Sequence, residues 1–328
     1  MAKIKAKPND SSLLNALSFI SLAQTNNSDI AYQKHCCIQN GMITATNGIL
    51  STGHKIEEDL DACPHTYSLL NALSKCGQTL SITQLENSKL SIKSGKFSAF
   101  VDCLDIPLPN ISPDASCAVI SDDLKLAMGK VSHLAVDAGK TVLESAVLLK
   151  SMTTAATSGF VILEAWHGID LPTCVLPKVF VSAVCNNDKK LKGFGFSVSS
   201  VTFWFEDESW IKTQVYAEQF PDISGILNVT LPETKPLTAG FFDAIRTIED
   251  FAENGREKGC VYFTDKGMRS KKAEGEGAFY EIEGLPVGYN FKIRQLKQVE
   301  DVCIKVAFDR GMLFCFSDGV RGVVQGVR

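Results

Sequence analysis

Three glycine-containing motifs could hold phosphate groups, but none has the complete pattern. Gly139-Lys140-Thr141 has the order that ends a phosphate-binding loop, in which backbone amides and a lysine bind phosphate oxygens. That loop also needs a glycine five positions before Gly139, and this chain has Leu134 there. Gly193-Phe194-Gly195 and Gly275-Glu276-Gly277 lack the third glycine of a dinucleotide-binding loop, so we interpret both as turns or bulges.

Side chains suited to metal binding or acid–base catalysis occur singly or in short runs. His35-Cys36-Cys37 has no second cluster at a zinc-like spacing, and in a strand its two cysteines would point to opposite faces. The acidic run at residues 57–61 is interpreted as solvated surface, and nothing marks His133 or His167 as a general base. We therefore predict no metal site, no cofactor and no enzymatic activity. An enzyme whose site is assembled from scattered Asp, His and Cys residues is the alternative of a different class.

The elements that would position any site belong to an ordinary globular protein. At 328 residues the chain exceeds the size at which one hydrophobic core keeps growing, which predicts two or three domains. Its residues are 45% hydrophobic and 21% charged, which is typical of neither disordered nor membrane proteins. There is no apolar run of membrane-spanning length, and residues 1–8 carry lysines without an apolar signal segment, so we expect a cytoplasmic protein.

The eleven cysteines do not form the pattern of a disulfide scaffold. They are scattered, odd in number and without a C-x-x-C pair. Many lie in apolar runs such as residues 302–304 and 313–316, where a free cysteine behaves as a small buried hydrophobe. This usage favours a reducing compartment.

The chain repeats itself at the spacing of one small domain. Residues 152–159 have the character of residues 41–48, which aligns Thr157 with Thr46. A second marker, the proline pair Pro109 and Pro221, has an offset that differs from the threonine offset by a single position. Two markers that agree on the period favour duplication over chance.

Each repeat is predicted to contain two helix-plus-strand halves. Helical spacing of apolar residues predicts six helices, at residues 11–23, 66–76, from 122 onward, near 176–180, 238–252 and 289–299. Short alternating runs and turn signals predict strands at 36–38, 42–46, 79–83, 89–93, 97–101, within 143–162, at 193–197, 201–205, 210–216, 260–263, 278–282, 302–308, 312–316 and 320–327. The first helix has Ser11 or Ser12 available as N-cap. Stretches rich in Pro, Ser, Asp or Thr place the domain boundaries so that the domains are 1–118, 119–234 and 235–328.

This organisation resembles the bacterial β sliding clamp, the processivity subunit of DNA polymerase III, over nearly the whole chain. Residues 44–49 and 154–159 look like the family's A-T-D-x motifs, residues 219–223 match its F-P-D-Y element, and residues 241–261 follow its third-domain helix and strand without a gap. The divergence is considerable and fits a clamp encoded by a phage or another mobile element. The resemblance implies an α+β fold of three DNA-clamp-type domains, with helices inside and sheets outside a ring.

The resemblance also implies a function and its partners. Two subunits would form a head-to-tail homodimer around double-stranded DNA, tether a DNA polymerase and be loaded by a clamp loader. Such a ring holds DNA by topology and needs only weak phosphate attraction, which suits a net charge of −4. That charge argues against binding by general basicity but not against basic residues gathered on one surface. The alternative is a clamp-fold peptide-binding adaptor or decoy that forms no ring.

Basic residues on the predicted helices are the candidates for facing DNA. They are Lys75, Lys125, Lys130, Lys178, Arg246, Lys292, Arg294 and Lys297. The alternative is that these are ordinary solvated side chains, since helix surfaces carry lysines in any case. The first predicted helix has no basic residue, which argues against a uniform lining of the hole.

Carried over from the family, a pocket for partner peptides would lie between the second and third domains. Its residues would be Thr157, Gly159, Phe160, Val161, Ile162, Pro221, Ile226, Val323, Val324 and Gln325. Gly225 stands where the family commonly has an arginine, Phe160 and Val161 replace its histidine and arginine, and the tail lacks its M-P-M-R-L ending. Phe160, Ile162 and Ile226 could instead be core residues.

The subunit junction is the last candidate site. Phe251 and Ala252 fall where the family places apolar side chains at this junction. On a helix with an apolar stripe, Phe251 could equally pack within its own domain.

Overall fold

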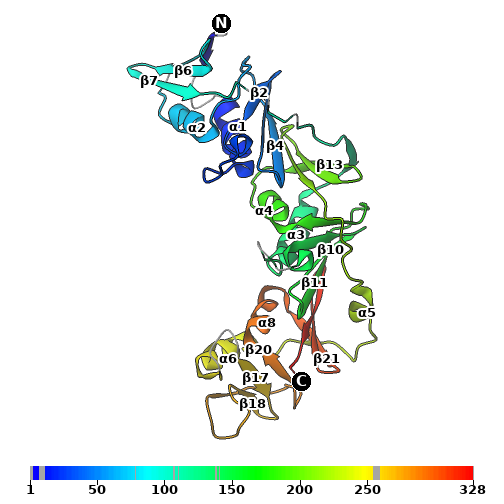
Figure 1. The fold of residues 1–328 in the computed structure, drawn as a ribbon. Helices are drawn as coiled ribbons and strands as arrows, with labels where there is room; N and C mark the ends of the chain where they lie inside the picture. Colours follow the sequence, from blue (N-terminus) through cyan, green and yellow to red (C-terminus); the bar gives the residue numbers. More distant parts are fainter. Residues whose placement is uncertain are drawn as a thin grey trace. The chain divides into compact units, whose positions relative to one another are not determined.

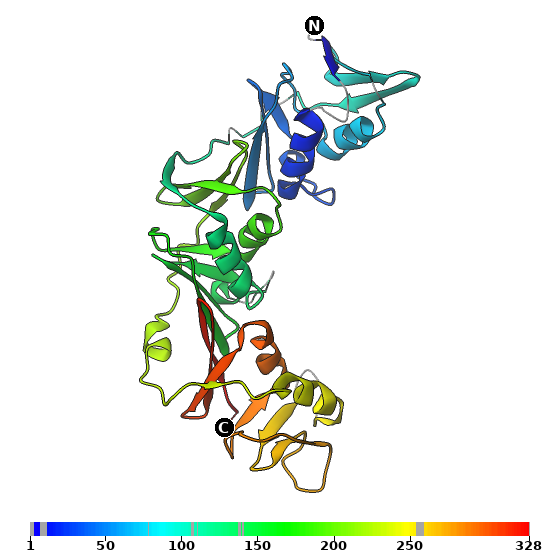
Figure 2. The same cartoon turned by 180° about the vertical axis from the view of Figure 1, so that it is seen from behind.

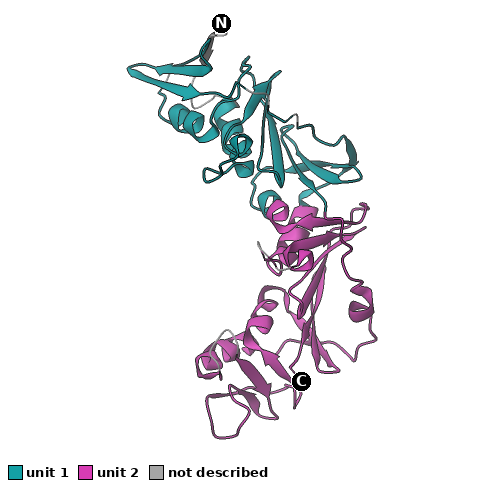
Figure 3. Ribbon diagram, in the orientation of Figure 1, with its two compact units in different colours: residues 1–122, 182–215 teal, residues 123–181, 216–328 magenta. Residues whose placement is uncertain are grey.

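The computed structural model describes residues 3–6, 12–77, 79–105, 108–109, 111–136, 139, 141–253 and 259–327. The predicted α+β class is confirmed, since helices alternate with sheets whose strand pairs are all antiparallel in the described part. The chain forms two compact units, shown in Figure 3. Unit 1 contains residues 1–122 and 182–215, and unit 2 contains residues 123–181 and 216–328. The three domains with boundaries at 118 and 234 stay a prediction.

Unit 1 is built on a seven-stranded sheet with the order β2-β3-β4-β15-β14-β13-β8. Its strands are β2 (Cys37–Gln39), β3 (Met42–Thr46), β4 (Leu50–Lys55), β15 (Trp210–Gln214), β14 (Ser200–Phe205), β13 (Leu191–Phe196) and β8 (Ser116–Val119). The pairing of β4 with β15 joins two segments that are far apart in sequence, as Figure 1 shows by their blue and green colours. The sheet therefore continues from the first predicted domain into the second.

The rest of unit 1 is a smaller sheet and the helices that cover the core. The smaller sheet has the order β1-β5-β6-β7, with β1 (Lys3–Ala6), β5 (Leu80–Leu85), β6 (Lys89–Ser94) and β7 (Phe97–Asp102). The helical segments are α1 (Ser12–Ile20), η2 (Ser21–Ala23), η3 (Ala31–Gln33) and α2 (Thr66–Ser74). Helix α1 packs against β3 and β4 through Leu13, Leu17 and Ile20, which are fully buried. Their spacing forms the apolar stripe that predicted this helix.

Unit 2 is built on an eight-stranded sheet with the order β12-β9-β10-β11-β23-β22-β21-β16. Its strands are β12 (Cys174–Pro177), β9 (Ala146–Leu149), β10 (Thr153–Thr157), β11 (Val161–Trp166), β23 (Val320–Gln325), β22 (Met312–Ser317), β21 (Lys305–Asp309) and β16 (Lys235–Pro236). The pairing of β11 with β23 corresponds to that of β4 with β15 in unit 1. Again the sheet crosses a predicted domain boundary.

A second sheet and several short helices complete unit 2 (Figure 2). The sheet has the order β19-β18-β17-β20, with β19 (Phe279–Glu281), β18 (Gly267–Arg269), β17 (Cys260–Phe263) and β20 (Asn290–Lys292). The helical segments are η4 (Val142–Ser145), α5 (Ser224–Leu227), α6 (Phe241–Ile248), η5 (Glu249–Phe251), α8 (Ile293–Lys297) and η6 (Glu300–Val302). The division into units falls at the start of α3 (Asp122–Ser132) and within α4 (Lys178–Cys185).

The two copies of the repeat form the same hydrogen-bonded turn. After β3 the Thr46 hydroxyl donates to the Leu50 carbonyl at 2.8 Å and accepts from the Gly48 amide at 3.1 Å. After β10 the Thr157 hydroxyl donates to the Val161 carbonyl at 2.8 Å and accepts from the Gly159 amide at 3.0 Å. Both glycines have left-handed φ angles, +92° and +85°, which favour glycine. In the third predicted domain, β18 and β19 are joined by a longer loop, residues 270–278.

Several predicted features need correction. Residues 289–299 do not form one helix, because residues 290–292 pair with β17 as strand β20 before α8 begins. The acidic run at 57–61 is not all solvated surface: Glu58 is buried and its carboxylate accepts from the Leu13 amide in α1 at 3.3 Å. A carboxylate at a helix N-terminus is favoured by the helix dipole. The predicted N-cap Ser11 lies outside the described residues.

All eleven cysteines lie in the described part, and all are free thiols, as predicted. Cys36, Cys76, Cys174, Cys303 and Cys315 are buried. Burial raises the pKa of the Cys36 thiol to about 12 and that of Cys174 to about 12, which keeps both thiols protonated and unreactive. These residues act as core side chains.

Candidate interaction sites

The predicted peptide-pocket residues come from three segments that unit 2 brings together. Strand β11 pairs with β23, so that Val161 lies opposite Val324 and Ile162 lies opposite Val323. The Gln325 amide also donates to the Phe160 carbonyl at 2.9 Å, which ties the turn before β11 to the C-terminal strand. The pairing accounts for the proximity of segments that are far apart in the sequence.

Strand alternation divides these residues between the two faces of the sheet. Ile162 and Val323 lie on the face that packs against residues 216–234, which we call the second connector. Val161 and Val324 lie on the opposite face and are fully buried. Thr157 is buried in the turn described above. Of these, Ile162 and Val323 are the ones placed on the connector-facing surface.

The second connector packs an apolar segment on that face. Ile223 and Leu227 are buried against a cluster that includes Phe314 and Val323. Ile226, which is 41% exposed, points away from this cluster, and Pro221 is also exposed. Phe160 is 53% exposed, so it is not the core residue of the alternative interpretation. Pro221 lines a cavity of about 270 Å³ together with Val142, Val175 and Phe220.

A buried ion pair that the sequence analysis missed anchors the second connector. Glu164, whose side chain is 4% exposed, accepts from Arg321 Nε at 2.7 Å and from Lys150 Nζ at 3.1 Å. Burial acts to raise the pKa of Glu164, but the hydrogen bonds from Arg321 and Lys150 outweigh burial and lower it. Arg321 Nη1 also donates to Asn228 Oδ1 at 2.9 Å and to the Leu227 carbonyl at 3.4 Å.

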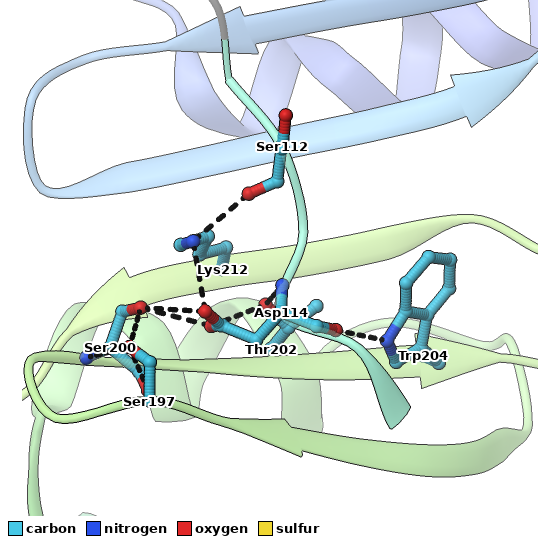
Figure 4. Close-up of polar contacts among 7 residues, drawn as sticks. All are labelled: Ser112, Asp114, Ser197, Ser200, Thr202, Trp204 and Lys212. Carbon is cyan, nitrogen blue, oxygen red and sulfur yellow. Dashed lines mark hydrogen bonds and ion pairs between the residues drawn. The ribbon is translucent and has the colours of Figure 1, made fainter. Parts of the chain in front are cut away.

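Unit 1 holds its own connector, residues 103–115, in a different way (Figure 4). We call these residues the first connector. The carboxylate of Asp114 accepts from Thr202 Oγ1 at 2.9 Å, Ser200 Oγ at 3.0 Å and Lys212 Nζ at 3.1 Å. Its amide donates to Thr202 Oγ1, and its carbonyl accepts from Trp204 Nε1 at 3.0 Å. Burial acts to raise the pKa of Asp114, yet the hydrogen bonds that its carboxylate accepts from Thr202, Lys212 and Ser200 lower it below the usual 3.8.

The glycines singled out in the sequence allow this connector to approach. A side chain at Gly195 would overlap the Asp114 carbonyl oxygen, and one at Gly193 would overlap Ser116 Oγ. The register of β13 shifts at these positions, so the predicted bulge is confirmed. The pair Gly275 and Gly277 lies in a loop with left-handed φ angles of +79° and +68°, as a turn requires.

The predicted DNA-facing residues are on or next to helices, but their charges are not all free. Arg246 makes ion pairs with Asp243 and Glu300, and Lys297 Nζ lies 2.8 Å from the buried Glu249 carboxylate. Lys130 Nζ donates to the Asp318 carbonyl at 3.4 Å, and Lys292 Nζ lies 5.8 Å from the ring centre of Phe160. Lys75 is exposed at the end of α2. The other three lie on α3 (Lys125), α4 (Lys178) and α8 (Arg294).

The candidate junction residues have opposite exposures. Phe251, at the end of η5, is 57% exposed, whereas Ala252 is 8% exposed. More than half of the Phe251 side chain is therefore left uncovered within its own unit. Its role at a subunit junction stays a prediction.

The other chemistry considered from the sequence is placed as follows. Cys36 is buried while Cys37 is half-buried, and the His35 and His65 rings meet edge to face at 5.2 Å. His133 Nε2 lies 2.7 Å from the Gln298 carbonyl, and the buried His167 accepts from the Ile169 amide through Nδ1. Across the residues the structure describes, three or more His, Cys, Asp or Glu side chains nowhere gather as a metal site would require. The motif at 139–141 includes Lys140, which lies outside the described residues.

No described helix combines the length and apolar character needed to span a bilayer.

Comparison with solved structures identifies the fold. The chain matches the sliding clamp of Bacillus subtilis with a TM-score of 0.82 and 15% identity over 100% of this chain and 99% of that one. It matches the Caulobacter crescentus polymerase III β subunit with a TM-score of 0.82 and 15% identity over 99% and 100%. The Helicobacter pylori β clamp, solved bound to a DNA ligase peptide, gives 0.78 and 15% over 99% and 100%. A scan of protein-family models and a search of curated proteins found no match. The chain therefore has the fold of the bacterial β sliding clamps from end to end.

Proposed function

We propose that this protein is a sliding clamp: a ring-forming, non-enzymatic cytoplasmic protein that encircles duplex DNA and tethers a DNA polymerase. The observation that carries the proposal is the match of the entire chain to β clamps, with TM-scores of 0.79 to 0.82 in three of them. A partial match would leave room for a single shared domain with another use. A match over the full length preserves the number and order of the repeats that a closed ring needs.

The charges of the chain suit retention by topology. A ring needs no strong attraction to phosphates, because DNA can leave it only through an end or an opened junction. The net charge is −4, α1 carries no basic residue, and carboxylates pair with Arg246 and Lys297. In this proposal helices line the hole, sheets face outward, and the basic residues on or next to the helices contribute weak, sequence-independent attraction.

A head-to-tail dimer needs two different surfaces that fit each other. Unit 2 supplies the exposed Phe251 beside Ala252. Unit 1 ends its smaller sheet with the edge strand β7, on which Phe100 is 64% exposed. An exposed aromatic on an unpaired strand edge is suited to pairing with another chain. We propose Phe100 and Phe251 as the two apolar sides of the junction.

Partner proteins are proposed to dock on unit 2 beside the second connector. Phe160 lies in the turn before β11 and Ile226 on α5, which contacts β23, and both side chains are exposed. The exposed Pro221 lies earlier in the connector, beside Val142 and Val175. The Helicobacter pylori clamp of the same fold binds a peptide of DNA ligase. Polymerase and clamp loader would use comparable short apolar peptides at this surface.

The decisive experiment for the ring uses DNA topology. After loading on a nicked circular plasmid by a clamp loader, the protein should co-elute with the DNA in gel filtration. Cutting the plasmid with a restriction enzyme should release it within minutes. Retention that is indifferent to the cut would contradict encirclement.

The junction can be tested by complementation. Phe251→Arg and Phe100→Arg should each convert the dimer to monomer in analytical ultracentrifugation, whereas Val198→Arg, at a side chain that is 98% exposed, should not. Mixing the two junction variants should restore one intact interface and produce a heterodimer. Two monomers that stay apart on mixing would reject this pair of surfaces.

A second candidate is a clamp-fold adaptor or decoy that binds peptides without forming a ring. The scarcity of unpaired basic charge on α1 and α6 is the observation that favours it. A strict monomer at micromolar concentration, with peptide binding intact, would select this alternative.

A further inference from the structure

Unit 1 contains a cavity of about 860 Å³ between the first connector and the seven-stranded sheet. Met42, Thr44, Trp204 and Trp210 line it from the sheet, and Leu108 and Ile111 line it from the connector. The register places Thr44 opposite Gly53, Gly53 opposite Trp210 and Trp210 opposite Trp204, so these residues share one face. The volume is within the range of ligand sites, and its wall combines these apolar side chains with polar and charged ones such as Gln39, Lys55 and Lys192.

The repeat identifies the corresponding region of unit 2. The cross-strand pair Gly53 and Trp210 corresponds to Glu164 and Arg321, at the same offset that relates Thr46 to Thr157. Thr44 likewise corresponds to Ala155, which lies in the apolar cluster beneath the second connector. The face that lines the cavity in unit 1 is therefore the face that the second connector covers in unit 2.

The difference in cover follows from connector length. After Pro221 the second connector forms helix α5 and then continues to the start of β16 at Lys235. After Pro109 the first connector reaches the start of β8 at Ser116, which is half that distance along the chain, and it has no helix in its described part. The shorter connector spans the sheet, and its described residues include no counterpart of helix α5. The cavity lies where the side chains of such a helix would be.

A polar group without a partner among the described residues lies beneath the cavity wall. Trp210 is fully buried, and its indole Nε1 has no acceptor among the described residues. A buried donor left unpaired is costly, so such groups are normally satisfied. In unit 2 the corresponding Arg321 donates to the Leu227 carbonyl at the end of α5. Gly53 allows the indole to take this position, because a side chain there would overlap the ring.

We propose that this cavity binds a short apolar peptide segment of a partner protein, in the place that α5 takes in unit 2. The segment would bury one or two aliphatic or aromatic side chains against Met42 and Trp204. This gives the chain a second peptide site, distinct from the surface beside the second connector. It does not depend on ring formation, because all of its residues belong to unit 1.

The probe for the test is present in the chain itself. A synthetic peptide with the sequence of residues 219–231 carries the α5 side chains that cover the corresponding face of unit 2. Added to the full-length protein, it should bind with a dissociation constant in the micromolar range by calorimetry. In the background of Trp166→Phe, the fluorescence of the two remaining tryptophans, Trp204 and Trp210, should change on binding.

Two variants locate the binding. Thr44→Phe, which places a ring in the cavity, should weaken binding at least about tenfold, because one buried side chain is worth about that factor. Thr79→Phe, at an exposed position of unit 1 outside the cavity lining, is its matched control and should bind within about twofold of the parent. Circular dichroism and thermal melting establish that each variant is folded.

Several outcomes would overturn the proposal. Binding that Thr44→Phe leaves unchanged would place the peptide on unit 2, in competition with the second connector. No binding at millimolar peptide would remove the peptide as occupant. Self-association that Thr44→Phe abolishes would identify a second copy as occupant instead. A bound small molecule in native mass spectrometry, lost in the same variant, would identify a small ligand.

Discussion

The two connectors cross equivalent sheet faces, but different sets of side chains hold them. In unit 1, Asp114 is bound by Thr202, Ser200 and Lys212 on strands β14 and β15. Thr202 pairs with Lys212 across strands β14 and β15, and the corresponding cross-strand pair of unit 2 is Phe314 and Val323. Phe314 and Val323 lie in the apolar cluster beneath α5. The duplicated sheet has thus kept its strand pairing while these two positions changed from polar to apolar, and the polar anchor of the second connector comes from Arg321 and Glu164 instead.

This difference shows which part of the repeat is constrained by folding. The strand ladders and the Thr-Gly turns recur because backbone hydrogen bonds must be satisfied in both copies. The connector-facing side chains are free to differ as long as each face is covered by groups of matching polarity. Substitutions of the connector-facing side chains should therefore have different effects in the two units, whereas substitutions in the shared turns should have equal effects.

Phe314→Ala should destabilise unit 2 by about 4 kcal/mol, because it opens a cavity beneath the second connector. The loss should be insensitive to pH and salt, since no charge is involved. Hydrogen exchange of residues 220–231 should accelerate, with no change around Asp114. Phe279→Ala, at a ring that is 49% exposed, is the control and should have little effect.

Asp114→Ala should destabilise unit 1 by about 3 kcal/mol at pH 7, because it leaves the partly buried Lys212 without its carboxylate. The pKa of Asp114 is lowered in the folded state, so its contribution is present above the unfolded value near 3.8 and is lost as the pH falls through the lower folded value. The difference between variant and parent in urea unfolding should therefore shrink below about pH 4. Asp29→Ala, at an exposed site, should show no such difference. A gap that stays constant down to pH 2 would contradict the role of the ionised form.

Arg321→Gln should destabilise unit 2 by about 2 kcal/mol, because Glu164 keeps Lys150 but loses its guanidinium partner. It should also release α5, so that hydrogen exchange of the amides at 226–229 accelerates more than exchange elsewhere in unit 2. The exposed Arg310→Gln is the matched control. If the two variants behaved alike, Arg321 would have no anchoring role.

Thr46→Val and Thr157→Val should each cost about 1 kcal/mol, because each removes a hydroxyl that both donates and accepts within its turn. The two values, measured by thermal unfolding, should agree within a few tenths of a kcal/mol. A large disagreement would show that the two turns are not energetically equivalent in spite of their common geometry.

The elements were predictable because their signals are local. The apolar stripe of α1, the alternation in β3 and β5 and the apolar run of β22 can be read within each short segment. The strand at 290–292 was missed because so short a segment before a helix carries no period of its own. Its partner strand β17 is not its neighbour in the chain, because β18 and β19 come between the two in the sequence. Glu58 was misassigned for a related reason, since the helix N-terminus that it caps lies 45 residues away.

The candidate site was only partly predictable. The turn at 157–162 and strand β23 could be named from motifs, but the anchors Glu164, Arg321 and Asp114 could not. Arg321 and Glu164 look like ordinary solvent-facing residues of alternating strands until β11 and β23 are paired. One sequence signal was available: Asp114 lies in the predicted boundary, where a single acidic residue next to proline could have been considered as an anchor.

By itself, the sequence determined most of the helices and strands, the duplication and the ordinary globular character of the chain, because each depends on neighbours in the chain or on direct repetition. Only the tertiary structure decided that two sheets run across the predicted boundaries, that Trp210 lies over Gly53, and that the shorter connector leaves a cavity where the longer one places a helix. The physical reason is that cross-strand pairing fixes which side chains share a face. That pairing is set by contacts between strands from distant parts of the chain, and no local pattern records it.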